Sequence, residues 1–106
     1  MRVYISGPMT GIDDYNFPLF NKVAQELTDL GYEVSNPAEK GIIEGWSWEQ
    51  YLVLDLHEVL DVDCLVMLPG WENSEGAKLE HYVATALKKQ TFAYEEFVSL
   101  LEFASL

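Results

Sequence analysis

The sequence predicts a single α/β domain, residues 1–106, in which a parallel sheet of about four to five strands lies between two layers of helices. Short runs of β-branched, aromatic and other apolar residues alternate with longer segments in which apolar residues recur every three or four positions. Glycine, proline or asparagine lies at many of the changes from one pattern to the other. Because strands that alternate with helices form parallel sheets covered on both faces, we expect a three-layer arrangement.

Four strands are expected. The first covers residues 2–6 (RVYIS) and ends at Gly7-Pro8. The third covers residues 64–68 (CLVML), which are apolar on both faces, as buried parallel strands are. The second and fourth strands are shorter and cover residues 32–35 and 91–93.

The first two helices have recognisable ends. Residues 17–30 carry apolar side chains with a 3.6-residue period, and Asn16 or Asp14 is the expected cap. Gly31 is expected to end this helix. A second helix over residues 48–60 begins at a capping box, because Ser47 is followed three positions later by Gln50.

The remaining helices complete the order βαβαβαβα, which is typical of flavodoxin-like and Rossmann-like domains. A third helix is expected over residues 74–89 with Ser74 as its cap, and a last helix over residues 94–105. Ligands of such domains bind at the carboxyl ends of the strands. The loops that begin at Gly7, Asn36 and Pro69 are therefore the expected binding loops.

The charge balance excludes some functions. The chain has 18 acidic and 6 basic residues and a net charge of −12, whereas clustered Lys and Arg supply most of the affinity for long nucleic acid. A single nucleotide can still bind, because backbone N–H groups at a helix N-terminus hold a phosphate without a basic side chain. No run of eighteen apolar residues predicts a membrane span, and the start MRVYISG does not resemble a signal peptide.

Cysteine and histidine are scarce. Cys64 is the single cysteine and lies in an apolar run, so a small buried thiol is the simplest interpretation. One cysteine cannot form an internal disulfide, which makes a reducing cytoplasm the expected compartment. Two histidines and one cysteine scattered along the chain do not form a metal site, and no cofactor is expected.

The segment YISGPMTG, residues 4–11, is the first candidate for ligand contact. A strand that ends in a glycine-rich turn lets the backbone approach a ligand closely. The segment has neither the GxGxxG pattern nor GxxxxGK followed by Ser or Thr, which disfavours dinucleotide and triphosphate sites. A simple turn into the first helix is the alternative. The candidate substrate-binding residues here are Ser6, Gly7, Pro8, Thr10 and Gly11.

The segment GWENSEGAKLE, residues 70–80, is the second candidate. Ser74 and Gly76 lie where backbone N–H groups at a helix start point at an anion. Glu80 shares a helix face with small residues, which leaves room beside its carboxylate for a reacting group. The alternative is an ordinary solvated glutamate. Asp55 is the third candidate, an acid in the largely apolar run YLVLDL, and its alternative is a solvent-facing side chain.

Taken together, these three segments resemble the nucleoside 2-deoxyribosyltransferase-like superfamily, which includes 2′-deoxynucleoside 5′-phosphate N-hydrolases. The resemblance covers nearly the whole chain. It comprises the aromatic strand that runs into Gly7-Pro8, the acid Asp55 on the helix before the third strand, and the motif Ser-x-Gly-x-x-x-Glu at residues 74–80. The phosphoribohydrolase pattern PGGxGTxxE also ends with Gly and Glu four apart, but its Pro-Gly-Gly is too close to the Glu to match Pro69-Gly70.

The resemblance implies cleavage or transfer at the N-glycosidic bond of a 2′-deoxynucleoside or its monophosphate. Glu80 would then be the nucleophile, Asp55 the general acid, and Tyr4 a hydrogen-bond donor to Glu80. Ser74 and the N–H groups near Gly7 and Gly76 would hold the 5′ end of the sugar. Trp71, like Trp46 and Trp48, is a candidate for stacking on the base, with simple packing as the alternative.

The sequence departs from the family pattern at two places. Met9-Thr10 stands where the phosphate-specific hydrolases have a basic residue, and Glu75 adds an acid where an anion would lie. The rival interpretation is a non-catalytic nucleotide-binding or interaction module that keeps the fold. A phosphate-accepting receiver domain is disfavoured, because Ser6-Gly7-Pro8 supplies no acid at the end of the first strand.

The last helix suggests self-association. Its apolar stripe gives a small domain more apolar surface than it can cover alone, so a homodimer or higher homo-oligomer is expected. The stripe consists of Phe97, Leu100, Leu101 and Ala104.

Overall fold

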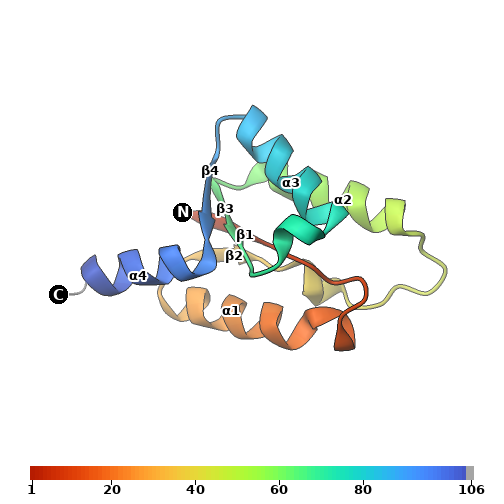
Figure 1. The fold of residues 1–106 in the computed structure, drawn as a ribbon, viewed down its shortest axis with the longest axis horizontal. Helices are drawn as coiled ribbons and strands as arrows, with labels where there is room; N and C mark the ends of the chain where they lie inside the picture. Colours follow the sequence, from red (N-terminus) through yellow and green to blue (C-terminus); the bar gives the residue numbers. More distant parts are fainter. Residues whose placement is uncertain (105–106) are drawn as a thin grey trace.

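The computed structural model describes residues 1–104, and it has the predicted α/β architecture. Four parallel strands form one sheet in the order β2-β1-β3-β4 (Figure 1). The strands are β1 (Arg2–Ser6), β2 (Glu33–Ser35), β3 (Cys64–Met67) and β4 (Gln90–Ala93). This is a flavodoxin-like or Rossmann-like topology, as the alternation of strands and helices predicted.

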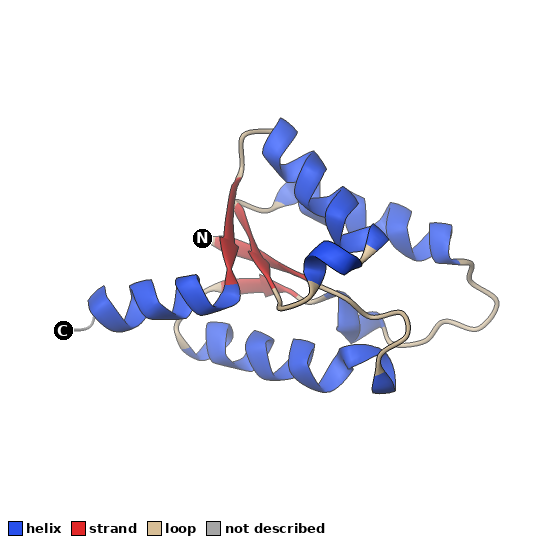
Figure 2. Ribbon diagram, in the orientation of Figure 1, coloured by secondary structure: helices blue, strands red, loops and turns tan. Residues whose placement is uncertain are grey.

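Four α-helices cover the two faces of the sheet, as Figures 1 and 2 show. They are α1 (Phe17–Asp29), α2 (Trp48–Asp61), α3 (Glu75–Ala86) and α4 (Tyr94–Ala104). Helices α1 and α4 pack on one face through a cluster that includes Phe20 and Phe97, and α2 and α3 cover the other through Val59 and Ala84. Alternation along the strands divides the core: Val3 and Ile5 face the α1 side, and Tyr4 faces the α2–α3 side.

The predicted helix caps at α2 and α3 are confirmed. The Ser47 hydroxyl accepts a hydrogen bond from the backbone N–H of Gln50, and the Gln50 side chain accepts one from the N–H of Ser47. The Ser74 hydroxyl accepts a hydrogen bond from the N–H of Ala77 at 3.2 Å. Both caps depend on residues close in sequence, which is why the local pattern was sufficient to find them.

Asn16 occupies the predicted N-cap position of α1, but the expected side-chain cap is absent. Neither Asp14 nor Asn16 caps the helix with its side chain, and Asn16 instead donates a hydrogen bond to the carbonyl oxygen of Pro8 at 3.0 Å. Asp14, Tyr15 and Asn16 all have left-handed backbone angles, with φ of 53°, 53° and 63°. They form part of a short 3₁₀ segment, η1 (Asp13–Asn16), that brings the chain back toward the end of β1.

Other element ends differ by a few residues. Helix α1 ends at Asp29, so Leu30 leaves the apolar stripe and is exposed, and Gly31 follows with φ +96° as predicted. Helix α3 ends at Ala86 rather than Lys89. Ser105 and the side chain of Ala104 lie outside the described part of the chain.

Helix α4 covers the core only with its first turns. Phe97 is buried and Leu101 packs against the same cluster, whereas Leu100 and Phe103 are 57% and 77% exposed. Figure 1 shows the end of this helix extending away from the sheet. Self-association through this helix stays a prediction. No helix within residues 1–104 is both long and apolar enough to span a membrane.

Candidate functional site

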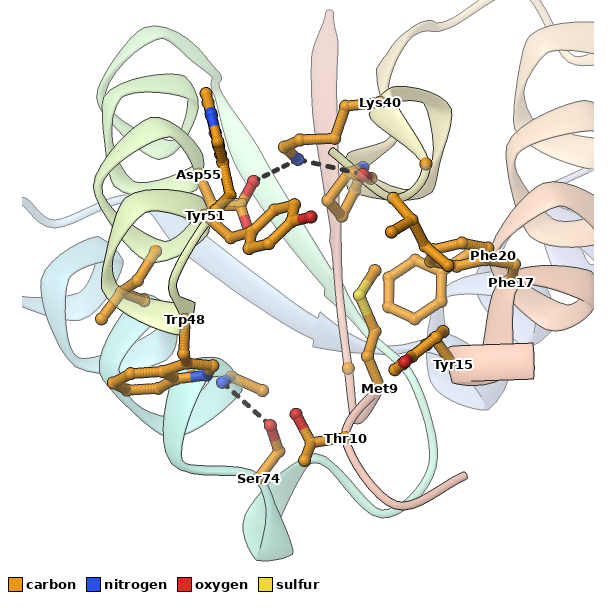
Figure 3. A pocket seen from close by; sticks show the side chains of 18 of the residues that line it. Met9, Thr10, Tyr15, Phe17, Phe20, Lys40, Trp48, Tyr51, Asp55 and Ser74 are labelled. Atoms are coloured by element: carbon orange, nitrogen blue, oxygen red, sulfur yellow. Dashed lines mark hydrogen bonds and ion pairs between the residues drawn. The ribbon is translucent and has the colours of Figure 1, made fainter. Parts of the chain in front are cut away.

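A cavity of about 430 Å³ lies at the carboxyl ends of the strands, where the topology led us to expect a ligand site (Figure 3). Its lining comes from the segment after β1, from the start of α1, from the segment that follows β2, and from the first turns of α2 and α3. Three ionisable side chains lie in this lining. Glu80 and Asp55 were predicted from the sequence, and Lys40 was not.

Glu80 is buried beside this cavity, and two side chains of β1 donate hydrogen bonds to it. The Tyr4 hydroxyl donates to Glu80 Oε2 at 2.8 Å, and the Ser6 hydroxyl donates to Oε1 at 2.6 Å. Glu80 is 5% exposed, and Tyr4 and Ser6 are fully buried. Glu80 is therefore not the solvated helix residue that was its alternative interpretation.

The sequence explains this arrangement. Tyr4 and Ser6 are two positions apart on β1, so their side chains point to the same face of the sheet. On α3, Ala77 and Ala84 are buried on the same side as Glu80, and their small size lets the helix lie close to the strand. The predicted contact between Tyr4 and Glu80 is present, whereas the contact from Ser6 to Glu80 was not anticipated.

The surroundings of Glu80 shift its acidity. Burial raises the pKa of Glu80 from its ordinary value of 4.5 to about 7, and the negative charge of Asp55 acts in the same direction. The hydrogen bonds from Ser6 and Tyr4 and the positive charge of Lys40 oppose this rise. Burial also raises the pKa of Tyr4 well above its ordinary value, so Tyr4 remains a hydrogen-bond donor at neutral pH.

Asp55 is paired with Lys40, a residue that the sequence analysis did not select. Lys40 Nζ lies 2.5 Å from Asp55 Oδ1 and 2.9 Å from the carbonyl oxygen of Pro37. Both side chains are largely buried, with 15% and 14% of their surfaces exposed. Burial raises the pKa of Asp55, and the ion pair with Lys40 counteracts that rise. One feature of the sequence indicates Lys40: it is the single Lys or Arg between Lys22 and Lys78.

The walls of the cavity are aromatic. Tyr15, Phe17 and Phe20 line one side, and Trp48 and Tyr51 lie opposite them (Figure 3). Trp46 also lines the cavity and packs edge-on against Tyr51, with ring centroids 5.3 Å apart. The Tyr51 hydroxyl accepts from the N–H of Ile43 at 2.7 Å and donates to its carbonyl oxygen at 3.1 Å, which fixes the segment above the cavity. Flat apolar walls of this kind suit a planar ring.

The other predicted binding residues separate into two groups. Gly7, Thr10, Ser74 and Gly76 line the cavity, and Figure 3 shows Thr10 and Ser74 close together at one end, away from the Lys40–Asp55 pair. Pro8, Gly11 and Trp71 do not line it, and neither does Ser6, which is fully buried and hydrogen-bonded to Glu80 instead. Trp71 instead stacks on His81 with ring centroids 4.5 Å apart and packs against the core cluster of Tyr4 and Val59. Within residues 1–104, no group of three His, Cys, Asp or Glu side chains is placed to hold a metal ion.

Gly7 is required by the packing of two strand ends. A Cβ atom at this position would lie 2.7 Å from Leu68 Cβ, which is shorter than the contact distance of two non-bonded carbon atoms. The glycine after β1 therefore lets the chain leave the sheet beside the end of β3, and this close passage forms one edge of the cavity.

Comparison with known families adds one finding. Residues 1–93 match a family model described as a domain of unknown function, DUF4406. The matched segment contains every residue discussed above for the cavity. No match was found among curated proteins.

Proposed function

Because the chain belongs to the DUF4406 family, whose description names no activity, we propose a function from the site itself: cleavage or transfer at the N-glycosidic bond of a 2′-deoxynucleoside or its monophosphate. The observation that carries the proposal is the buried Glu80 carboxyl group, held by two hydroxyl donors in the same cavity as Asp55. The resemblance of residues 74–80 and Asp55 to the deoxyribosyltransferase-like superfamily supports it.

The reaction proceeds in two steps. In the first, the Glu80 carboxylate attacks C1′ of the sugar, the bond from C1′ to the base nitrogen breaks, and Asp55 transfers its proton to the leaving base. The product is a glycosyl ester on Glu80. In the second step, water or another base attacks C1′ and releases Glu80, while Asp55 takes up a proton from the attacking group. Two inversions leave the configuration at C1′ unchanged, as in retaining glycosidases.

The cavity offers partners for each part of such a substrate. The base fits between the aromatic walls, where Trp48 and Trp46 replace Trp71 as the stacking candidates. The Thr10 and Ser74 hydroxyls are suited to the 5′ end of the sugar. Tyr4 and Ser6 hold Glu80 in one rotamer, and their hydrogen bonds stabilise the carboxylate form that must attack. No cofactor is required for either step.

A panel experiment tests the proposal. The purified protein is incubated with deoxynucleosides, ribonucleosides and their 5′-monophosphates, with and without a free acceptor base, and base release and exchange are followed by chromatography. We expect turnover of deoxyribose substrates in preference to ribose ones, because a 2′-hydroxyl destabilises the cationic transition state. Equal turnover of both sugars contradicts this preference.

The alternative is a non-catalytic nucleotide-binding or interaction module. The net charge of −12 and the presence of a single cationic side chain, Lys40, in the cavity lining favour it over an enzyme for phosphorylated substrates. A mass-spectrometric search for a covalent adduct with a 2′-fluoro-substituted deoxynucleoside separates the two functions. An adduct on Glu80 supports the enzyme, and neither adduct nor turnover on any substrate supports the module.

A further inference from the structure

Lys40 is paired with Asp55 in the cavity, and the two-step reaction above gives Lys40 no part. Lys40 follows β2 in the short 3₁₀ segment η2 (Pro37–Lys40), and Asp55 lies on α2, so two separate elements meet in this pair. The ammonium group makes two contacts, to Asp55 Oδ1 and to the Pro37 carbonyl oxygen, and the second contact anchors it to η2. The position of Lys40 is therefore set by the backbone rather than by Asp55 alone.

The two oxygens of Asp55 have different surroundings. Oδ1 is held by Lys40, whereas no hydrogen bond to Oδ2 is found among the described residues. No buried side-chain oxygen or nitrogen among these residues lacks a partner, so Oδ2 is accessible rather than buried. Because Asp55 lines the cavity and its Oδ1 is occupied by Lys40, Oδ2 is the oxygen left to bind a ligand.

The charges around Asp55 oppose one another. Glu58, one turn further along α2 and hydrogen-bonded to the Ser35 hydroxyl of β2, raises the pKa of Asp55, as does burial. Glu80 on α3 lines the same cavity, and Tyr4 on β1 is neutral at ordinary pH. Among the described residues, Lys40 is the only group that lowers the pKa of Asp55. Without Lys40, Asp55 would be surrounded by two carboxyl groups and no cation.

We propose that Lys40 is the positioning residue of Asp55: it fixes Oδ1, directs Oδ2 to the leaving base, and determines the pH range in which Asp55 exchanges its proton. The proposal rests on the proposed function for the part played by the leaving base. The coupling between Lys40 and Asp55 does not depend on that function and is measurable without a substrate.

The test compares three variants of the intact chain. Lys40→Met removes the charge and keeps most of the side-chain length, and Lys40→Arg keeps the charge. Lys78→Met is the matched control, because it removes an exposed lysine from a surface pair with Glu75 at 3.2 Å, outside the cavity lining. The pKa of Asp55 is measured by NMR titration of carboxyl-labelled protein, with Asp55→Asn to assign the signal, and circular dichroism verifies folding.

We expect the pKa of Asp55 to rise by about 1 to 3 pH units in Lys40→Met, as is typical when an adjacent opposite charge is lost. The pKa of Glu80 should rise less, because Lys40 is the smallest of the influences on it. Lys40→Arg should restore the Asp55 value, and Lys78→Met should leave it unchanged. If Lys40→Met does not fold, Lys40→Gln provides the same loss of charge with the hydrogen-bonding capacity retained.

The kinetic part uses the substrate identified by the panel. One limb of the pH profile of kcat/KM should move to higher pH in Lys40→Met by the same amount as the Asp55 titration, and should return with Lys40→Arg. In an Asp55→Asn background, Lys40→Met should have no further effect on the profile. An unchanged pKa of Asp55 in Lys40→Met overturns the proposal. A raised pKa of Asp55 combined with an unchanged pH profile of kcat/KM also overturns it. If wild type turns over no substrate, the proposed function fails, and the NMR titration alone decides whether Lys40 controls Asp55.

Discussion

Replacing Glu80 by glutamine is predicted to stabilise the protein at neutral and alkaline pH while it removes the proposed activity. The pKa of Glu80 rises from 4.5 to about 7 on folding, so the folded protein favours the protonated form. Below about pH 4.5, Glu80 is neutral in both states and its ionisation costs nothing. Between pH 4.5 and 7 the unfolded chain loses this proton and the folded protein keeps it. The free energy of unfolding therefore falls with rising pH in this range and levels off above pH 7.

The magnitude follows from the size of the pKa change. Each pKa unit corresponds to ~1.36 kcal/mol, so the rise from 4.5 to about 7 costs roughly 3 kcal/mol of folding stability above pH 7. Glutamine removes this cost, but its amide group cannot accept from both hydroxyls as the carboxylate does. One of the hydrogen bonds from Tyr4 and Ser6 must reverse or be lost, and this loss reduces the stability gained by about 1 kcal/mol. The net gain is on the order of 2 kcal/mol at pH 8, and at pH 4, where only the hydrogen-bond loss remains, it becomes a loss of about 1 kcal/mol.

Urea unfolding at a series of pH values between 4 and 8 measures this difference directly. In a domain of this size, ~2 kcal/mol also raises the Tm by roughly 10 °C. Glu75→Gln is the control, because the Glu75 side chain is 81% exposed at the start of the same helix, and its stability should change by less than ~0.5 kcal/mol. The reasoning is refuted if the stability difference between Glu80→Gln and wild type does not change with pH. Turnover that survives in Glu80→Gln separately refutes its role as nucleophile.

Three further predictions concern single positions. Gly7→Ala should destabilise the fold by about 1 to 3 kcal/mol, because the new Cβ would meet Leu68 Cβ at 2.7 Å, and a lower urea midpoint tests this. Tyr4→Phe removes one of the two donors to Glu80 and should raise the pKa of Glu80 above about 7, which NMR titration measures; an unchanged or lower value would argue against the hydrogen bond. Lys88→Gly should stabilise the end of α3 by about 1 kcal/mol, because Lys88 has φ of 62° in a region that glycine adopts without cost, and a lower Tm would contradict the strain.

The sequence predicted those features that depend on neighbouring residues. The helix caps at Ser47 and Ser74 and the stop at Gly31 follow from short patterns, and the parallel sheet follows from the alternation of strands and helices. The contact between Tyr4 and Glu80 was predicted from resemblance alone, because 76 residues separate the two side chains.

The remaining features depend on tertiary structure. Lys40 in η2 reaches Asp55 in α2 only in the folded chain, and no local pattern encodes a contact between side chains 15 residues apart in a loop and a helix. The left-handed backbone of Asp14, Tyr15 and Asn16 could not be predicted from the sequence either, because none of the three residues is glycine. Trp71 was one of three equivalent tryptophans in the sequence, and only the packing of α3 places it beside His81 instead of in the cavity.

The two acids of the cavity are held in ways that suit different roles. Glu80 is held by neutral hydroxyl groups, which stabilise its carboxylate without cancelling its charge, so in the proposed reaction the ionised form would keep a full negative charge for attack at C1′. Asp55 is held by an ammonium group, which neutralises the ionised carboxylate and makes it the weaker nucleophile. A carboxyl group whose charge is balanced in this way gives up a proton without leaving an unpaired buried charge behind. For the proposed reaction, this difference assigns attack at C1′ to the Glu80 carboxylate, which predominates only above about pH 7, and proton donation to Asp55.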